Sequence, residues 1–150
     1  AIDARVDPKR AVTEITIYTP DHAGLFSRIA GAMALSRANI VDARIFTFTN
    51  GWALDVFFVQ DVEGRPIEDP ESLERLRKRI AAALSGTLKL DRELAGRESL
   101  PKRAHVFQVP PRVLIDNAAS RFATVIEVNG RDRPGLLYDV TKALTGCGLQ

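Results

Sequence analysis

Two segments of the 150-residue chain carry the same residue pattern at a fixed distance along the sequence. Each has a run of β-type residues, then a loop with the spacing Asp-x-x-Gly, then apolar residues at helical intervals. The loops begin at Asp21 and Asp132, and their glycines are Gly24 and Gly135, so both pairs are 111 positions apart (132 − 21 and 135 − 24). A repeat of this kind predicts a duplicated small domain rather than a single enzyme fold.

The first unit has the pattern of a small α+β domain. Asn50 and Gly51 predict a tight hairpin, because both residues tolerate the positive φ angles of a type I′ turn. Asp69 and Pro70 predict the start of a helix, and Gly86 predicts its end. The expected elements are a strand at 12–19, a helix from Leu25, strands at 39–49 and 52–61, and a helix that begins at Pro70.

The residues after this helix complete the first unit. The polar stretch 87–103 predicts an irregular excursion or a short extra helix. A strand is expected at 105–109, and 113–115 could continue or flank it after an interruption by two prolines. The order β-α-β-β-α-β over 12–115 predicts a ferredoxin-like antiparallel sheet with both helices on one face.

The second unit contains only the first part of that order. It predicts a strand at 124–129, a loop at 130–135 and a helix at 136–146. A strand and a helix cannot bury their apolar faces alone, so this piece must dock on the first unit or on another chain. We therefore expect one domain at 12–117 and the start of a second, truncated domain at 118–150.

The composition is that of a folded protein with little charge bias. Hydrophobic residues make up 45% of the chain, charged residues 27%, and the net charge is +2. Nucleic acid and membrane surfaces are therefore not expected as partners. The single cysteine, Cys147, excludes an internal disulfide and is typical of a reducing compartment, and no apolar run is long enough to span a bilayer. These features predict a cytoplasmic protein.

No residue pattern predicts catalysis, a metal site or a cofactor. The two histidines, His22 and His105, and the single cysteine are too dispersed for a zinc site or a nucleophile with its base. Asp55 and Asp61 point to the same face of one strand but have no companion metal ligands. The aromatic residues at 46–58 do not match an RNA-recognition motif, so they are expected in the core or on a sheet face that a neighbouring module covers.

The two Asp-x-x-Gly loops are the candidate binding elements. Each leads into a helix, whose first turn presents unpaired N–H groups and the positive end of the helix dipole, so a ligand carboxylate fits there. Gly24 and Gly135 lack a Cβ atom and allow close approach of the ligand. Asp21 and Asp132 could attract an ammonium group, but the favoured interpretation is that each caps its own helix.

The loop motifs resemble a known family. Asp21-His22-Ala23-Gly24-Leu25-Phe26 and Asp132-Arg133-Pro134-Gly135-Leu136-Leu137 are similar to the D-x-P-G-L signature of ACT domains, which are ferredoxin-like regulatory modules that typically bind amino acids. Ala23 stands where the family usually has proline. The stretches Val109–Asn117, Thr124–Val128 and Asp132–Asp139 resemble the C-terminal ACT tandem of the bacterial PII uridylyltransferase/uridylyl-removing family.

The resemblance implies a regulatory function and a ligand. It implies glutamine sensing that controls attached nucleotidyltransferase and hydrolase domains acting on the PII signalling protein, and no chemistry by the chain itself. In ACT pairs the ligand lies between the loop of one module and the second strand of the other, so loop 132–137 is expected to face residues 39–42. The candidate ligand-binding residues are Asp132, Arg133, Pro134, Gly135, Leu136, Leu137, Asn39, Ile40, Val41, Asp42, Asp21, His22, Ala23, Gly24 and Leu25.

A second interpretation stays open. ACT-like sheets often pair side by side, so the chain could serve mainly to dimerise or to bind a protein partner without a ligand. A homo-oligomer formed through sheet or helix pairing is expected in either case.

Overall fold

The computed structural model describes residues 1–96, 110–130, 133 and 135–149. The chain divides into two compact units, Ala1–Ser99 together with Pro134–Gln150, and Leu100–Arg133. The larger unit holds a mixed sheet-and-helix domain, and the smaller one holds a hairpin. The expected division into domains at 12–117 and 118–150 stays a prediction.

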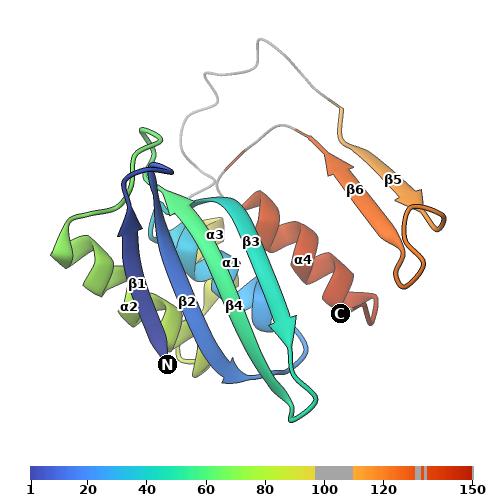
Figure 1. Cartoon of the computed structure of the whole chain (residues 1–150), viewed down its shortest axis with the longest axis horizontal. Helices are drawn as coiled ribbons and strands as arrows, with labels where there is room; N and C mark the ends of the chain where they lie inside the picture. Colours follow the sequence, from blue (N-terminus) through green and yellow to red (C-terminus); the bar gives the residue numbers. More distant parts are fainter. Residues whose placement is uncertain (97–109, 131–132, 134, 150) are drawn as a thin grey trace. The chain divides into compact units, whose positions relative to one another are not determined.

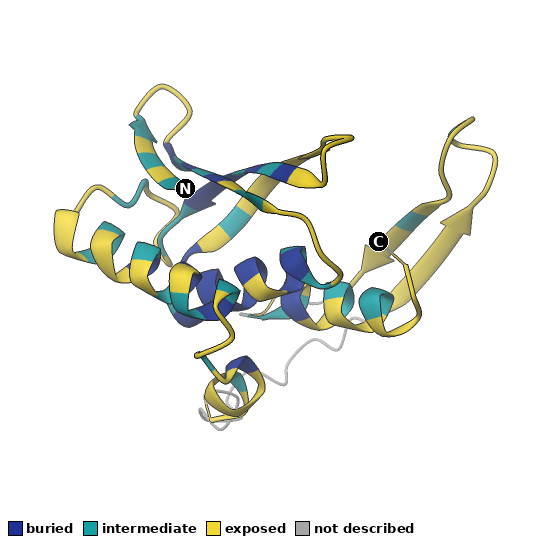
Figure 2. Ribbon diagram, turned by 90° about the horizontal axis from the view of Figure 1, so that it is seen from below, coloured by how far each residue is buried: buried dark blue, intermediate teal, exposed yellow. Residues whose placement is uncertain are grey.

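The larger unit is built on a four-stranded antiparallel sheet with the order β1-β2-β4-β3 (Figure 1). Helices α1 and α2 lie on one face of this sheet (Figure 2). The α+β, ferredoxin-like class is thereby confirmed. The elements are β1 Ile2–Asp7, β2 Val12–Pro20, α1 Leu25–Leu35, β3 Asn39–Thr47, β4 Trp52–Gln60, α2 Pro70–Leu84, α3 Leu90–Ala95 and α4 Leu136–Gly146.

The core lies between this sheet and its helices. Alternate residues of β2 and β4 point to the helices, as strand geometry requires, and meet the apolar faces of α1 and α2. Asp69 caps α2 by accepting a hydrogen bond from the N–H of Ser72 at 2.8 Å, as predicted. The largest fully buried apolar side chains are Phe57, Ile15, Ile17, Ile29, Met33, Leu76, Ile80 and Val59.

One strand of the sheet was not predicted. β1 pairs antiparallel with β2 and forms one edge of the sheet, so the fold begins before Val12. Its pattern was visible in the sequence, because Ile2, Ala4 and Val6 alternate with charged residues and are half-buried. The strand expected at 105–109 lies outside the described residues. Within 87–103, the short helix α3 agrees with one of the two alternatives.

The β3–β4 hairpin is present, but its turn differs from the predicted type. Gly51 has a φ of 78°, whereas Asn50 does not have a positive φ, so the turn is not type I′. The N–H of Gly51 donates to the carbonyl of Phe48 at 3.1 Å. This is a longer hairpin loop with a left-handed glycine. The Asn50 side chain instead accepts a hydrogen bond from the N–H of Trp52 at 3.1 Å.

The smaller unit repeats the first hairpin of the larger one. It consists of β5 Arg112–Asp116 and β6 Val125–Asn129, paired antiparallel. Val113 pairs with Val128, and the residues 111 positions earlier, Ile2 and Ile17, are also a pair. The duplication predicted from the two loops therefore extends to β1 and to the register of both hairpins.

Helices α1 and α4 also begin and end alike. Gly24 and Gly135 precede them in the left-handed conformation, with φ of 79° and 86°. At the other end the N–H of Ala38 donates to the carbonyl of Met33 at 3.0 Å, as one bond of a Schellman motif. The equivalent bond of α4, from Leu149 to Leu144, is also 3.0 Å long.

The left-handed residue of this motif is Arg37 in α1 and Gly148 in α4, with φ of 57° and 76°. Arg37→Gly is expected to raise the free energy of unfolding by about 1 kcal/mol, because glycine avoids the steric cost of this conformation. Urea unfolding of the two proteins measures the difference. Gly148→Arg is the reciprocal control and should lower stability. Equal or lower stability of Arg37→Gly would contradict the prediction.

Helix α4 packs against α1 through a close contact at one glycine. Tyr138 of α4 is only 6% exposed and belongs to the core cluster. A Cβ atom at Gly31 would lie 2.8 Å from Cδ2 of Tyr138 and 3.1 Å from Cδ1 of Leu90. The absence of a side chain at Gly31 therefore lets the two helices and α3 meet.

Candidate functional site

The first Asp-x-x-Gly loop is fixed by backbone hydrogen bonds. The N–H of Asp21 donates to the carbonyl of Gly51 at 2.9 Å, and that of Leu25 donates to the carbonyl of His22 at 3.1 Å. Gly24 occupies the N-cap position of α1, and no side chain caps the helix. The expectation that Asp21 caps α1 is therefore wrong, because the left-handed glycine separates Asp21 from the helix start.

The N-terminus of α1 is suited to a carboxylate. Its first turn carries no acidic residue, so the positive end of the dipole is not neutralised from within the helix. Leu25 is buried, whereas Asp21, His22 and Ala23 are exposed, so the approach to the loop is polar. These features agree with a binding loop.

The second loop is described only in part. Asp132 and Pro134 lie outside the described residues, while Arg133 is exposed. Leu136 is half-buried and Leu137 is exposed at the start of α4. Among the described residues no side chain caps α4, and a Cβ atom at its N-cap residue would lie 3.9 Å from Leu94 of α3.

The predicted partner of the second loop is the beginning of β3. Asn39, Val41 and Asp42 are exposed there and Ile40 is half-buried. The register shifts between Ile40 and Asp42, so Val41 is the extra residue of a bulge. Asp42 lies 3.9 Å from the guanidinium of Arg10. The pairing of loop 132–137 with residues 39–42 stays a prediction.

The structure brings together the start of α1 and the end of α4. A Cβ atom at Gly24 would lie 3.6 Å from Cγ2 of Thr145. At the opposite end of the contact, Gly31 lies against Tyr138, so the two repeated helices run in opposite directions. The first loop therefore adjoins the second copy of the helix, a contact that spacing in the sequence did not predict.

A buried carboxylate lies near the first loop. Asp55 of β4 is 1% exposed, and its Oδ1 atom has no hydrogen-bond partner among the described residues. Burial, followed by the negative charge of Asp21, raises the pKa of Asp55 to about 6. The sequence pattern did not support Asp55 as a metal ligand and predicted no other role for it. The available signal was an acidic residue at an inward position between Ala53 and Phe57.

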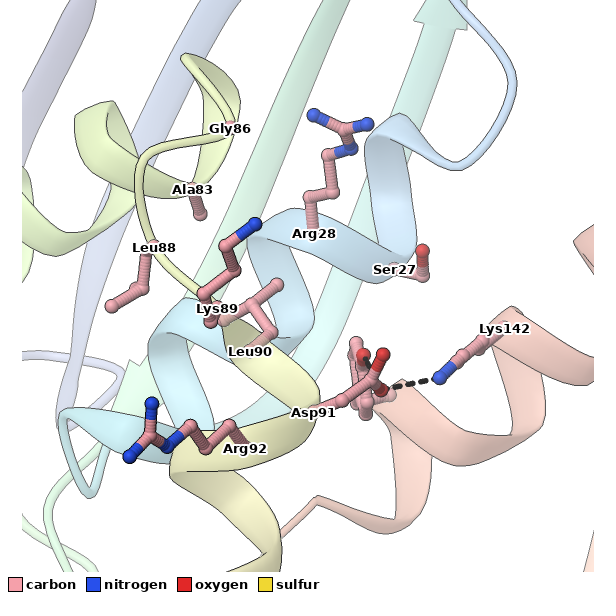
Figure 3. Close-up of a pocket in the computed structure, with 11 residues that line it drawn as sticks. Ser27, Arg28, Ala83, Gly86, Leu88, Lys89, Leu90, Asp91, Arg92 and Lys142 are labelled. Carbon is pink, nitrogen blue, oxygen red and sulfur yellow. Dashed lines mark hydrogen bonds and ion pairs between the residues drawn. The ribbon is translucent and has the colours of Figure 1, made fainter.

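An open groove of about 590 Å³ lies among α1, the segment joining α2 to α3, and α4 (Figure 3). Lys142 forms an ion pair with Asp91, which also accepts a hydrogen bond from the hydroxyl of Tyr138 at 2.7 Å. The hydrogen bond from Lys142, and next that from Tyr138, hold the pKa of Asp91 below its ordinary value. Arg28 and Lys89 make the rest of the groove basic. Its polar contacts tie α3 to α4.

The aromatic residues divide between core and surface. Phe57 and Phe58 are buried; Phe58 lies on the face opposite the helices, where the guanidinium of Arg10 covers its ring at 4.2 Å. On the same face Tyr18 and Trp52 stack with their ring centroids 4.7 Å apart, and both remain partly exposed. This end of the sheet face is thus apolar and open.

Other classes of site find no support in the part of the chain that the structure describes. The residues searched contain no group of three or more histidine, cysteine or acidic side chains that could hold a metal ion. Among the described helices, none combines the length and the hydrophobicity that crossing a bilayer requires.

Comparison with known proteins gives consistent matches to one kind of enzyme. The chain is 58% identical over 99% of its length to the bifunctional uridylyltransferase/uridylyl-removing enzyme of Azospirillum brasilense. It is 52% identical over its whole length to that of Rhodospirillum rubrum and 54% identical over 99% to that of Gluconobacter oxydans. No family model and no solved structure matches the chain.

The matches cover a limited part of these relatives, since the chain spans 16% of the length of each of the three. The matched stretch covers nearly the whole chain and therefore both repeats. The chain is therefore homologous to one region of the bifunctional uridylyltransferase/uridylyl-removing enzymes.

Proposed function

We propose that this chain is the regulatory, amino-acid-binding module of a uridylyltransferase/uridylyl-removing enzyme. It belongs to the ACT type and senses a small amino acid, with glutamine as the ligand implied by the family resemblance. Ligand binding biases the activities of nucleotidyltransferase and hydrolase domains, which act on the PII signalling protein in nitrogen regulation. Such control requires different ligand affinities in two arrangements of the enzyme.

The observation that carries this proposal is the repeated loop-to-helix junction. Gly24 and Gly135 have the same left-handed conformation before helices of the same length. A plain strand-to-helix turn does not require this glycine conformation twice, and in the first copy the glycine leaves the N-terminus of α1 without a side-chain cap. An uncapped N-terminus supports carboxylate binding, because its N–H groups have no acceptor in the helix.

Isothermal titration of the chain with glutamine tests the proposal. We expect saturable binding at ligand concentrations up to the millimolar range, and at least a tenfold loss of affinity in Gly24→Ala. Gly24, with a φ of 79°, lies in the first of the two candidate loops, where a ligand carboxylate would meet the N-terminus of α1, and the substitution strains it.

The matched control is Gly51→Ala. Gly51 has nearly the same φ, 78°, and open space around it, but it lies in the β3–β4 turn. The Gly51→Ala substitution imposes similar backbone strain away from the N-terminus of α1. The affinity of this variant for glutamine should therefore equal that of the unchanged chain. Absence of binding by the unchanged chain, or equal affinity in both variants, would count against the proposed site.

One set of observations favours an interaction module as the second candidate. β3 is a nine-residue edge strand of the described sheet, so one side of its backbone has no strand partner among the described residues. Phe46 and Phe48 are 50% and 44% exposed at its end. Light scattering with and without amino acids separates the two functions. An oligomer whose size does not change when amino acids are added, and which binds none of them in the titration, would support the interaction module alone.

A further inference from the structure

The core of the larger unit contains one carboxylate that has no structural explanation. Asp55 lies between Ile17 and Ile45 in the sheet register and shares the helix-facing side with the core residue Phe57. Its Oδ1 atom is buried and has no hydrogen-bond partner among the described residues. Burying an unpaired carboxylate costs free energy, and native proteins rarely leave such a group unsatisfied.

Asp55 lies near the start of α1, because Phe57, two residues along β4 on the same side, packs against Phe26 of α1 with the ring centroids 5.3 Å apart. Asp21, at the start of that loop, is the second cause of the raised pKa of Asp55, after burial. Two carboxylates near each other repel, so each makes ionisation of the other more costly. A positive charge between them would relieve both the repulsion and the missing hydrogen bond.

The edge strand beside Asp55 is exposed, although Asp55 itself is buried. Ile45 is the neighbour of Asp55 on β3 and faces the same side, yet it is 46% exposed. Thr47, the next residue of β3 on that side, is also exposed. The helices therefore cover β4 but leave β3 exposed at this level, so the exposed surface of the sheet begins one strand away from Asp55.

We propose that Asp55, together with Asp21, is the receptor for the α-ammonium group of an amino-acid ligand whose carboxylate binds at the N-terminus of α1. The inference rests on the proposed function and adds to it the group that recognises the amine. An ammonium group donates up to three hydrogen bonds and carries the charge that the two carboxylates lack. Ligands without that group leave Asp55 unpaired.

A divalent metal ion fits this place less well. Calcium takes six or more oxygen ligands, and magnesium demands near-octahedral geometry. Among the described residues no group of three acidic, histidine or cysteine side chains gathers at Asp55. Two carboxylates beside a helix N-terminus instead offer both signs of charge, which is the complement of a zwitterion.

Titration of the chain with two matched compounds tests the inference. Glutamine is compared with 4-carbamoylbutanoate, which keeps the carboxylate and the amide but lacks the amine. We expect glutamine to bind at least tenfold more tightly. In Asp55→Asn that preference should shrink to less than threefold, with glutamine affinity falling at least tenfold, while thermal unfolding shows that the variant is folded.

Glu14→Gln is the charge-matched control. Glu14 pairs with Phe58 on the opposite face of the sheet, so the same loss of charge there should leave glutamine affinity unchanged. Equal glutamine affinity in Asp55→Asn and the unchanged chain would overturn the inference while leaving the proposed function intact. Binding of no amino acid by the unchanged chain would overturn both.

Discussion

Asp55→Asn is expected to raise the free energy of unfolding at pH 8 by about 2 kcal/mol in the absence of ligand. The pKa of Asp55 rises from 3.8 to about 6 in the fold, and a rise of that size corresponds to about 3 kcal/mol. Asparagine removes this cost, but it keeps a buried polar group, so the gain is smaller than the full value. Urea unfolding at pH 8 measures it.

The gain should depend on pH with a defined sign. Because the folded-state pKa of Asp55 lies above the unfolded one, the folded chain holds this proton more tightly. The contribution of Asp55 to stability is therefore greatest below about pH 4 and is lost as the pH rises through about 6. The advantage of the variant should be small at pH 4, grow up to about pH 6 and stay level above it.

The difference between the two proteins isolates Asp55 from other acids. Hydrogen bonds lower the pKa values of Asp61, Asp69 and Asp91. The stability that these three groups contribute to the fold is therefore lost as the pH falls, and it is lost equally in both proteins. A difference that does not change between pH 4 and pH 8, or a variant less stable than the unchanged chain at pH 8, would contradict the prediction.

A more stable variant that binds less well would have a clear meaning. Residues that reduce stability in the free protein often persist where function requires them. In that case saturating glutamine should stabilise the unchanged chain more than Asp55→Asn, because binding to the folded state alone adds to its stability. Unfolding with and without glutamine thus connects the free-energy cost of burying Asp55 with its proposed role in binding the ligand amine.

The sequence predicted those strands and helices whose residue pattern also matches the face that they bury in the fold. β2 and β4 alternate, α1 and α2 carry apolar faces, and Asp69 with Pro70 marks the start of α2. In each case the residue period that defines the element also defines its buried face, so the core follows from the same pattern. The two loops and their helices were predictable for the additional reason that each copy supports the other.

Other features depend on partners that a linear pattern does not contain. β1 alternates apolar and charged residues, but it is short and only half-buried, and its pairing with β2 is what makes it part of the sheet. The turn at Asn50 is set by a side-chain hydrogen bond to the N–H of Trp52. At Asp55 the pattern and the fold disagree, because an inward position of the sheet holds an acid. Such a conflict points to function more often than to packing.

Gly31 of α1 is the point where α4, the helix of the second repeat, packs against the first repeat. Gly31→Ala is expected to lower the free energy of unfolding by about 2 kcal/mol, because the new methyl group overpacks the contact with Tyr138. The Cβ atom would lie 2.8 Å from the tyrosine ring, which is buried and held by a hydrogen bond to Asp91. Hydrogen exchange should locate the loss in α4, and urea unfolding should give its size.

Gly146→Ala is the matched control, since Gly146 is also helical but has open space around it. The same change there should be neutral or stabilising by up to about 1 kcal/mol, because alanine favours helix. Tyr138→Ala removes the clashing ring, so Gly31→Ala should cost much less in that background. If the two substitutions instead had independent effects, the contact between Gly31 and Tyr138 would not be what joins α4 to the first domain.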